Sequence, residues 1–244
     1  MLRVGALAVG ITQLPARRDA KRMKRAREPE DDLPSETSLC IDLCLGLLKG
    51  GVLRVVWLHQ LYALVPNRTL VDREVEEMRR TMGVRVLNTP LGQAIMRADA
   101  YLDDLLVQNE EKEEAVFRFE KWLRTADNIS LSLSASSLSS SDVHVLLQRG
   151  WLASRRDVNV QDVYWVSHPR LNKMVTSLLA VRRKVIGMIA RTRYKEMAQK
   201  DIRGEILGPQ QFAESSYYHY DLIGSGCVDT VKTASGGAVF RALL

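Results

Sequence analysis

The sequence has little of what disulfide frameworks and membrane spans require. It has three cysteines in 244 residues, Cys40, Cys44 and Cys227. An odd and small number of cysteines excludes a disulfide framework and favours a reducing compartment. No run of 18 apolar residues occurs, so we expect no membrane-spanning helix and no membrane partner.

Sequence motifs for catalysis are also absent. The chain lacks a phosphate-binding loop of the GxxxxGK[ST] type, a GxGxxG motif after a strand, and the HRD, DFG, APE-type and VAIK-type elements of protein kinases. It also lacks a GxSxG elbow, an HExxH helix and an EF-hand loop. The four histidines are scattered and form no zinc-ligand spacing with the cysteines. We therefore expect a protein that is not an enzyme and that holds no metal and no cofactor.

What the chain does have is positive charge in two places. The apolar share of 46% and the charged share of 26% are typical of a folded domain, and the net charge is +6. Residues 1–27 carry net +7 and residues 170–205 carry net +7, so the remainder is net −8. Two basic segments in an otherwise acidic chain favour a polyanion as partner.

Residues 1–35 are predicted to be a disordered basic arm followed by an acidic linker. The cations of the arm have the spacing of a nuclear localisation segment, although a solvated charge run is the alternative. These cations are Arg17, Arg18, Lys21, Arg22, Lys24, Arg25 and Arg27. The short apolar opening, residues 1–16, resembles a signal segment, but the basic cluster after it argues against export and favours the nucleus.

From residue 36 onward, helices followed by a hairpin are predicted three times. This order is typical of the winged helix, a helix-turn-helix with a β-wing. The predicted domains are winged helix 1 at 36–108, winged helix 2 at 109–169 and winged helix 3 at 170–244. The fold class is therefore α+β and mostly helical, with three tandem winged-helix domains.

Hydrophobic periodicity and turn residues give the individual elements. The predicted helices are 35–48, 56–65, 69–82, 110–125, 142–149, 171–199 and 211–223, with a shorter segment at 202–207. The predicted hairpins are 84–96, 151–166 and 227–243, and residues 130–141 are expected to form a strand or short helix. Asp103 and Asp104 are expected at or before the start of a helix.

The predicted helix after Pro169 carries cations of one sign along one stripe. At 100° per residue, five cations fall within a narrow arc, and the apolar side chains centre about 100° away. The five are Arg170, Lys173, Lys184, Arg191 and Lys195. Arg182 and Arg193 fall on the opposite flank. A stripe of one sign favours contact with phosphates, and an acidic protein partner is the alternative.

Two segments of the chain resemble one known family closely. They are LHQLYALVPNRTLVDREVEEM (Leu58 to Met78) and, from Arg193 onward, RYKEMAQKDI followed by YYHYDLIGSGCVDTVKTASGGAVFRAL. The chain resembles the serine/threonine-protein kinase 19 family from about Leu47 to Leu244, including a weaker match at YWVSHP (Tyr164 to Pro169). The apolar opening and the middle near Ser130–Ser141 match poorly.

The resemblance implies a protein that is not a kinase despite the family label. It implies three tandem winged helices that bind double-stranded DNA and act in transcription-coupled nucleotide excision repair. The implied partners are stalled RNA polymerase II, the Cockayne syndrome A protein and TFIIH. The implied DNA-contacting positions are Arg68, Arg182, Arg191, Arg193 and Lys195. Whether two copies bind DNA as a dimer is left open.

Three functions from different classes are therefore considered. The first is a nuclear DNA-binding scaffold that neutralises phosphates, largely without reading sequence. The second is a protein-interaction module whose basic face binds an acidic partner. The third and most remote is a protein kinase, as the family label suggests, against which the missing kinase motifs stand.

Overall fold

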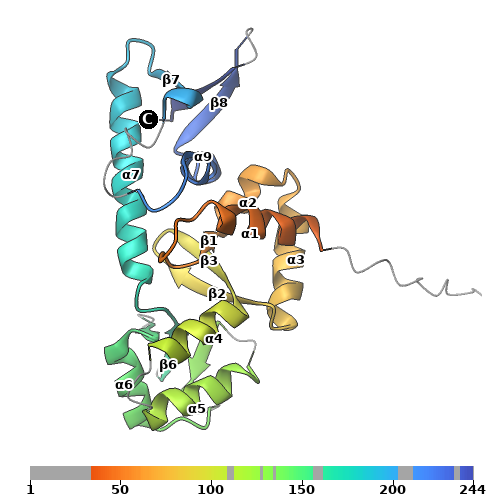
Figure 1. The fold of residues 1–244 in the computed structure, drawn as a ribbon, viewed down its shortest axis with the longest axis vertical. Helices are drawn as coiled ribbons and strands as arrows, with labels where there is room; N and C mark the ends of the chain where they lie inside the picture. Colours follow the sequence, from red (N-terminus) through yellow and green to blue (C-terminus); the bar gives the residue numbers. More distant parts are fainter. Residues whose placement is uncertain are drawn as a thin grey trace, which may run out of the picture. The chain divides into compact units, whose positions relative to one another are not determined.

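A computed structural model describes residues 34–108, 113–126, 129–133, 136–155, 162–202, 211–233 and 237–243. The predicted basic arm, with its localisation residues Arg17 to Arg27, lies outside the described residues. Residues 203–207 of the predicted short segment at 202–207 also lie outside them. Helices and small sheets alternate along the chain, which confirms a mixed helix-and-strand fold (Figure 1). Each sheet has three antiparallel strands, and the strand that comes last in sequence lies in the middle.

The first sheet belongs to a segment in which one helix, one strand and two further helices are followed by a hairpin. The elements are α1 (Glu36–Gly46), β1 (Val56–Trp57), α2 (Leu58–Leu64), α3 (Arg68–Arg80), β2 (Val84–Thr89) and β3 (Gly92–Arg97). Side chains cap two of these helices: the Ser35 hydroxyl accepts the N–H of Ser38, and the Asn67 side chain accepts the N–H of Leu70. Val56, expected to begin a helix, is instead paired with Ile95 in β1.

The second sheet follows two further helices. The elements are α4 (Ala98–Val107), α5 (Glu114–Leu123), β4 (Ser130–Ser132), α6 (Ser140–Arg149), β5 (Leu152–Ser154) and β6 (Val163–Val166). A capping box at Ser139 begins α6, and Gly150, with φ of 80°, ends it as predicted. The serine-rich stretch supplies β4, whose Leu131 is fully buried.

The third sheet follows the longest helix. The elements are α7 (Leu171–Arg191), β7 (Glu196–Ala198), the 3₁₀ turn η2 (Gln199–Asp201), α9 (Ser215–Gly224), β8 (Val228–Lys232) and β9 (Ala238–Ala242). The predicted hairpin at 227–243 is therefore confirmed, with Thr230 opposite Phe240. The predicted helix at 211–223 begins only at Ser215, because Ala213 forms a β-bridge with Leu48.

The prediction that the long helix continues to Gln199 is wrong. α7 ends at Arg191, and the chain turns through Thr192–Lys195 into β7. The turn is favoured because β7 pairs with β9, with Glu196 opposite Arg241 and Met197 opposite Phe240. Pairing with a strand more than 40 residues away outweighs the local helical periodicity.

The expected position of Asp103 and Asp104 is also wrong. Both lie inside α4, a helix that the sequence analysis did not predict. Its apolar residues Ala98, Tyr101 and Leu105 recur at helical spacing and are buried. The helix begins directly after β3, so no turn residue marks its start.

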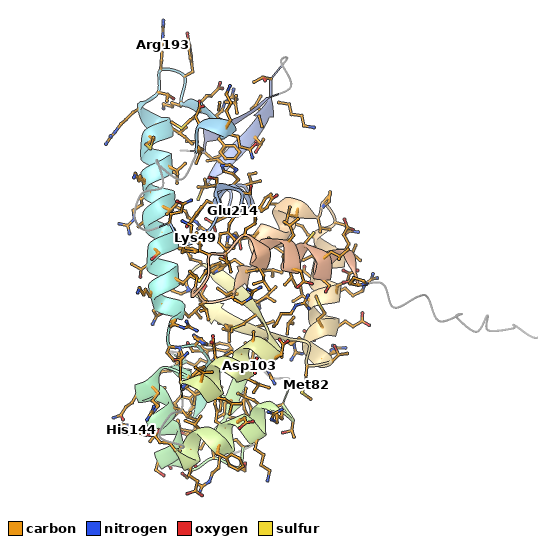
Figure 2. All side chains as sticks on the ribbon, viewed as in Figure 1. Lys49, Met82, Asp103, His144, Arg193 and Glu214 are labelled. Carbon is orange, nitrogen blue, oxygen red and sulfur yellow. The ribbon has the colours of Figure 1, made fainter. Side chains whose placement is uncertain are left out.

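The third sheet is held against the first by α9 and α2, which lie side by side (Figure 1). A Cβ at Gly224 would lie 1.8 Å from the carbonyl oxygen of His59, so only glycine permits this approach. The Tyr217 hydroxyl donates to the carbonyl of Val55 at 2.8 Å. Lys49 and Glu214 (Figure 2) add backbone bonds from N–H to the carbonyls of Phe212 and Leu47, respectively, at 3.0 and 2.8 Å. These contacts join the first and third sheets.

Candidate nucleic-acid interface

Three cations predicted to share a stripe do so on the solvent side of α7. Lys173, Lys184 and Arg191 are all exposed, and their spacings of 11 and 7 residues place them within about 20° on a helical wheel. At 1.5 Å per residue, the stripe extends about 27 Å along the helix. The opposite side is buried through Leu171, Met174, Val175, Leu178, Val181, Val185 and Ile189. α7 is therefore amphipathic, with cations as the principal charges on its outer side.

The cations of this stripe are not neutralised within the described part of the chain. No described carboxylate lies within ion-pair distance of Lys173, Lys184 or Arg191. α7 itself contains no acidic residue from Leu171 to Arg191. Because an unpaired cation keeps its full field toward solvent, the stripe is an electropositive surface ready for an anion. We call Lys173, Lys184 and Arg191 the α7 stripe.

The turn after α7 extends the same charge. Arg193 and Lys195 are exposed, although neither is helical, so Lys195 is not part of the helical stripe that the sequence predicted. Figure 2 shows Arg193 at the end of α7, directed away from the rest of the molecule. Like the α7 stripe, neither cation has an ion-pair partner among the described residues.

Arg182 is placed differently from the other predicted residues. Its side chain is only 11% exposed, and its Nε and Nη2 donate to the carboxylate of Asp221, each at 2.6 Å. His59 Nε2 lies 2.8 Å from the same carboxylate. Burial lowers the pKa of Arg182, but the Asp221 carboxylate raises it more, so the guanidinium stays charged. Arg182 thus links α7, α9 and α2, and it does not lie on the exposed stripe.

Arg170 and Arg68 lie at helix beginnings. Arg170 immediately precedes α7, is 41% exposed, and its Nη2 is 2.7 Å from Asp104 of α4. Arg68 is exposed at the first position of α3, with its guanidinium 5.5 Å from the centre of the Tyr62 ring. Arg170 is therefore partly neutralised, and Arg68 belongs to a different helix from the stripe.

The helix before the third hairpin cannot enter a DNA groove as a recognition helix usually does. α9 is packed against α2, and Tyr217, Tyr218, His219, Asp221 and Leu222 are all buried. No sequence signal could have shown this, because Asp221 meets residues 39 and 162 positions away. Cations on α7, and not side chains of α9, therefore face solvent in this part of the molecule.

The described residues contain no group of three or more His, Cys, Asp or Glu side chains placed to hold a metal ion. None of the described helices is long and apolar enough to cross a bilayer. The three cysteines are free thiols, and burial raises the pKa of Cys44 to about 12.

Comparison with known proteins gives one family and several relatives. Residues 47–242 match the family described as inactive serine-threonine protein kinase 19. The chain is similar to Winged helix repair factor 1 of Xenopus laevis, 25% identical over 234 residues that cover 90% of this chain and 88% of that protein. It is also similar to the Homo sapiens and Mus musculus proteins of the same name, 23% and 22% identical over 202 residues, or 78% of each chain.

Proposed function

Because this chain belongs to the inactive serine-threonine protein kinase 19 family, we propose that it is a non-enzymatic, winged-helix DNA-binding scaffold of DNA repair. The relatives' shared name, Winged helix repair factor 1, supports both the winged-helix fold and a role in repair. The family description as inactive, together with the missing kinase motifs, supports a function without phosphotransfer. A phosphotransfer assay on highly purified protein should therefore show no nucleotide-dependent activity.

The repeated sheet topology supports the proposal of three winged helices. In each sheet the strand before the last helix pairs with the final strand, and the two last strands form the wing hairpin. Helices precede each hairpin in every case. These repeats support domains at 36–108, 109–169 and 170–244, each with its own wing.

The observation that most directly supports DNA binding is that the cations of the α7 stripe have no ion-pair partner among the described residues. A length of about 27 Å exceeds the major-groove width of about 12 Å, so Lys173 and Arg191 can reach phosphates on both sides of a groove. Each neutralised phosphate releases condensed counterions, which favours binding entropically. Because α9 is buried, this mode contacts the phosphate backbone and leaves base edges largely unread.

Binding to duplex DNA across a salt series tests this proposal. The logarithm of affinity should fall with the logarithm of salt concentration by about 0.9 per phosphate contact. Reversing all three stripe cations, with Lys173→Glu, Lys184→Glu and Arg191→Glu, should reduce that slope by about 2 to 3. A flat response of the unaltered protein between about 50 and 200 mM salt would contradict phosphate contact.

A control for the triple variant must carry the same change of charge elsewhere. Arg54, Arg73 and Lys121 are exposed and lie outside α7, so replacing each of them by Glu changes the net charge equally. This control should keep most of the salt slope. Equal losses in both triple variants would show that net charge, and not the stripe, governs binding.

We further propose a cellular compartment, a repair pathway and protein partners. We place the protein in the nucleus, in transcription-coupled nucleotide excision repair, with stalled RNA polymerase II, the Cockayne syndrome A protein and TFIIH as partners. Support comes from the family resemblance and from the basic cluster at Arg17–Arg27. Co-precipitation from nuclear extract treated with nuclease tests the partners, and a fluorescent fusion with that cluster neutralised tests the localisation.

The competing function is a module whose stripe binds an acidic protein. The triple Glu variant separates the two functions, since it would then lose the protein complex and keep its affinity for DNA. Loss of DNA affinity with retention of the protein complex supports the DNA-binding scaffold.

A further inference from the structure

Hydrogen bonds close the turn that follows α7, and this turn directs two side chains toward solvent. The Thr192 hydroxyl donates to the carbonyl of Ile189 at 2.7 Å and accepts the N–H of Glu196 at 2.9 Å. The N–H of Lys195 donates to the carbonyl of Thr192 at 3.1 Å, and Lys195 has a left-handed φ of 53°. These bonds close the turn around Arg193 and Tyr194, and both side chains project into solvent.

Tyr194 is an unusual surface residue because it is aromatic and 72% exposed. Of the described aromatic side chains, only Tyr194 and Phe117 are exposed, since the others are buried or half-buried. A tyrosine ring normally packs its faces against other atoms and leaves only its hydroxyl in water. The guanidinium of Arg193 lies 5.4 Å from the centre of the Tyr194 ring.

The surroundings of Tyr194 are cationic. Arg191, Arg193 and Lys195 flank it, all exposed and without an ion-pair partner among the described residues. An exposed ring at an apolar protein-binding surface would have apolar neighbours. Aromatic rings among cations are instead typical of surfaces that bind unpaired nucleotides, where cations hold the backbone and the ring stacks on a base.

We infer that Tyr194 is a base-stacking residue that makes the protein prefer DNA containing unpaired bases over fully paired duplex. This inference rests on the proposed DNA-binding function and specifies the kind of DNA. In intact duplex each base is covered on both faces by its neighbours, so a protein ring finds no free face. At a bubble or a single-strand junction, a base face is free, and Tyr194 can cover it while Arg191, Arg193 and Lys195 hold the adjoining phosphates.

The test compares two DNA molecules of the same length and sequence in one strand. One is fully paired, and the other has a central bubble of unpaired bases. The full chain should bind the bubble more tightly, and Tyr194→Ala should reduce affinity for the bubble by about tenfold while changing duplex affinity by less than about twofold. Tyr194→Phe should keep the preference because the ring is retained.

A matched control and a direct probe sharpen the test. Phe117→Ala removes the other exposed aromatic ring, which lies on α5 beside the paired Arg118 and Glu114, and it should leave both affinities unchanged. A 2-aminopurine placed in the bubble should lose fluorescence on binding the unaltered protein and keep it with Tyr194→Ala.

Each other outcome overturns the inference in a distinguishable way. Equal affinity of the unaltered protein for both molecules, with salt-dependent binding retained, removes the stacking role and leaves the proposed function standing. An equal loss on both DNAs in Tyr194→Ala would show that the ring only positions Arg193. Loss of a protein partner with both DNA affinities intact would assign Tyr194 to protein docking. Failure of the unaltered protein to bind either DNA would contradict the proposed function itself.

Discussion

α3 and α7 each carry several cations on an outer side, yet they present different surfaces to a partner. α3 has four arginines and four acidic residues, whereas the five cations of α7 have no acidic neighbour in the helix. On α3, Glu76 accepts hydrogen bonds from both Arg79 and Arg80 at 2.8 and 2.9 Å. These bonds, with Arg79 contributing most, lower the pKa of Glu76 to about 2, so the carboxylate stays charged.

The difference shows that pairing, more than the number of cations, decides which helix can bind a polyanion. A cation already held by a carboxylate must give up that bond before it can bind a phosphate, whereas an unpaired cation loses only water and counterions. The same rule separates Arg182 from its neighbours on α7, because Asp221 neutralises it. Four predictions test this difference between the helices and the contacts that hold α7.

The largest effect is expected from Asp221→Ala, which would leave the buried Arg182 without its partner. An uncompensated buried charge destabilises by about 3 kcal/mol or more. The free energy of unfolding from urea titration should fall by about that amount, whereas Asp229→Ala, at an exposed position in β8, should change it by less than about 0.5 kcal/mol. A small effect at Asp221 would mean that Arg182 is as free as the α7 stripe.

The second effect is a dependence of stability on pH, caused by the buried His168 just before α7. The pKa of His168 is lowered to about 4, mainly by burial. The Asp104 carboxylate raises this pKa and the Arg170 guanidinium lowers it further. Since the unfolded histidine binds a proton near pH 6.5, the unfolded chain holds more protons between pH 6.5 and 4. The free energy of unfolding should therefore fall as pH drops through this window, by about 3 kcal/mol.

Urea titrations at several pH values between 7.5 and 4 measure this dependence. His168→Asn should flatten it, although the buried His219, whose pKa is also lowered by burial, will keep part of the slope. His144→Asn, at an exposed position on α6, should leave the dependence unchanged. The same slope in His168→Asn as in the unaltered protein would refute the assignment.

Much of the fold could be predicted because its signals are local. The hairpins at 84–96 and 227–243 follow turn residues between alternating segments, and the buried side of α7 follows helical periodicity as far as Ile189. The exposed positions of Lys173, Lys184 and Arg191 follow from the same periodicity, since residues on one side of a helix share its environment.

What could not be predicted depends on residues far apart in the chain. Helical spacing continues past Thr192, and only pairing of β7 with β9 ends the helix at Arg191. Arg182 falls near the buried side in the sequence pattern, but its partner Asp221 is 39 residues away, so a buried ion pair and an exposed contact look alike. Tyr194 lies in the predicted helix 171–199 on the side opposite the apolar residues, and only the end of α7 at Arg191 places it in an exposed turn among cations.

The third prediction compares one cation from each helix. Lys184→Glu on the α7 stripe should lower affinity for duplex DNA by about tenfold and reduce the salt slope by about 1. Arg80→Glu on α3 makes the same change of charge at an exposed cation that Glu76 already pairs, and affinity should change by less than about twofold. Equal losses would show that both helices contact DNA and that pairing is not decisive.

The smallest effect is expected from Glu76→Gln, which makes α3 more like α7 by removing the carboxylate that pairs with Arg79 and Arg80. Surface ion pairs of this kind contribute little, so the free energy of unfolding should fall by about 0.5 kcal/mol. Affinity for duplex DNA should rise by about twofold in low salt and return to its original value at high salt, because salt screens the positive charge that α3 gains when the carboxylate is removed. Unchanged affinity in low salt would mean that α3 faces away from the DNA, and the contrast between the helices would then be one of position and not of pairing.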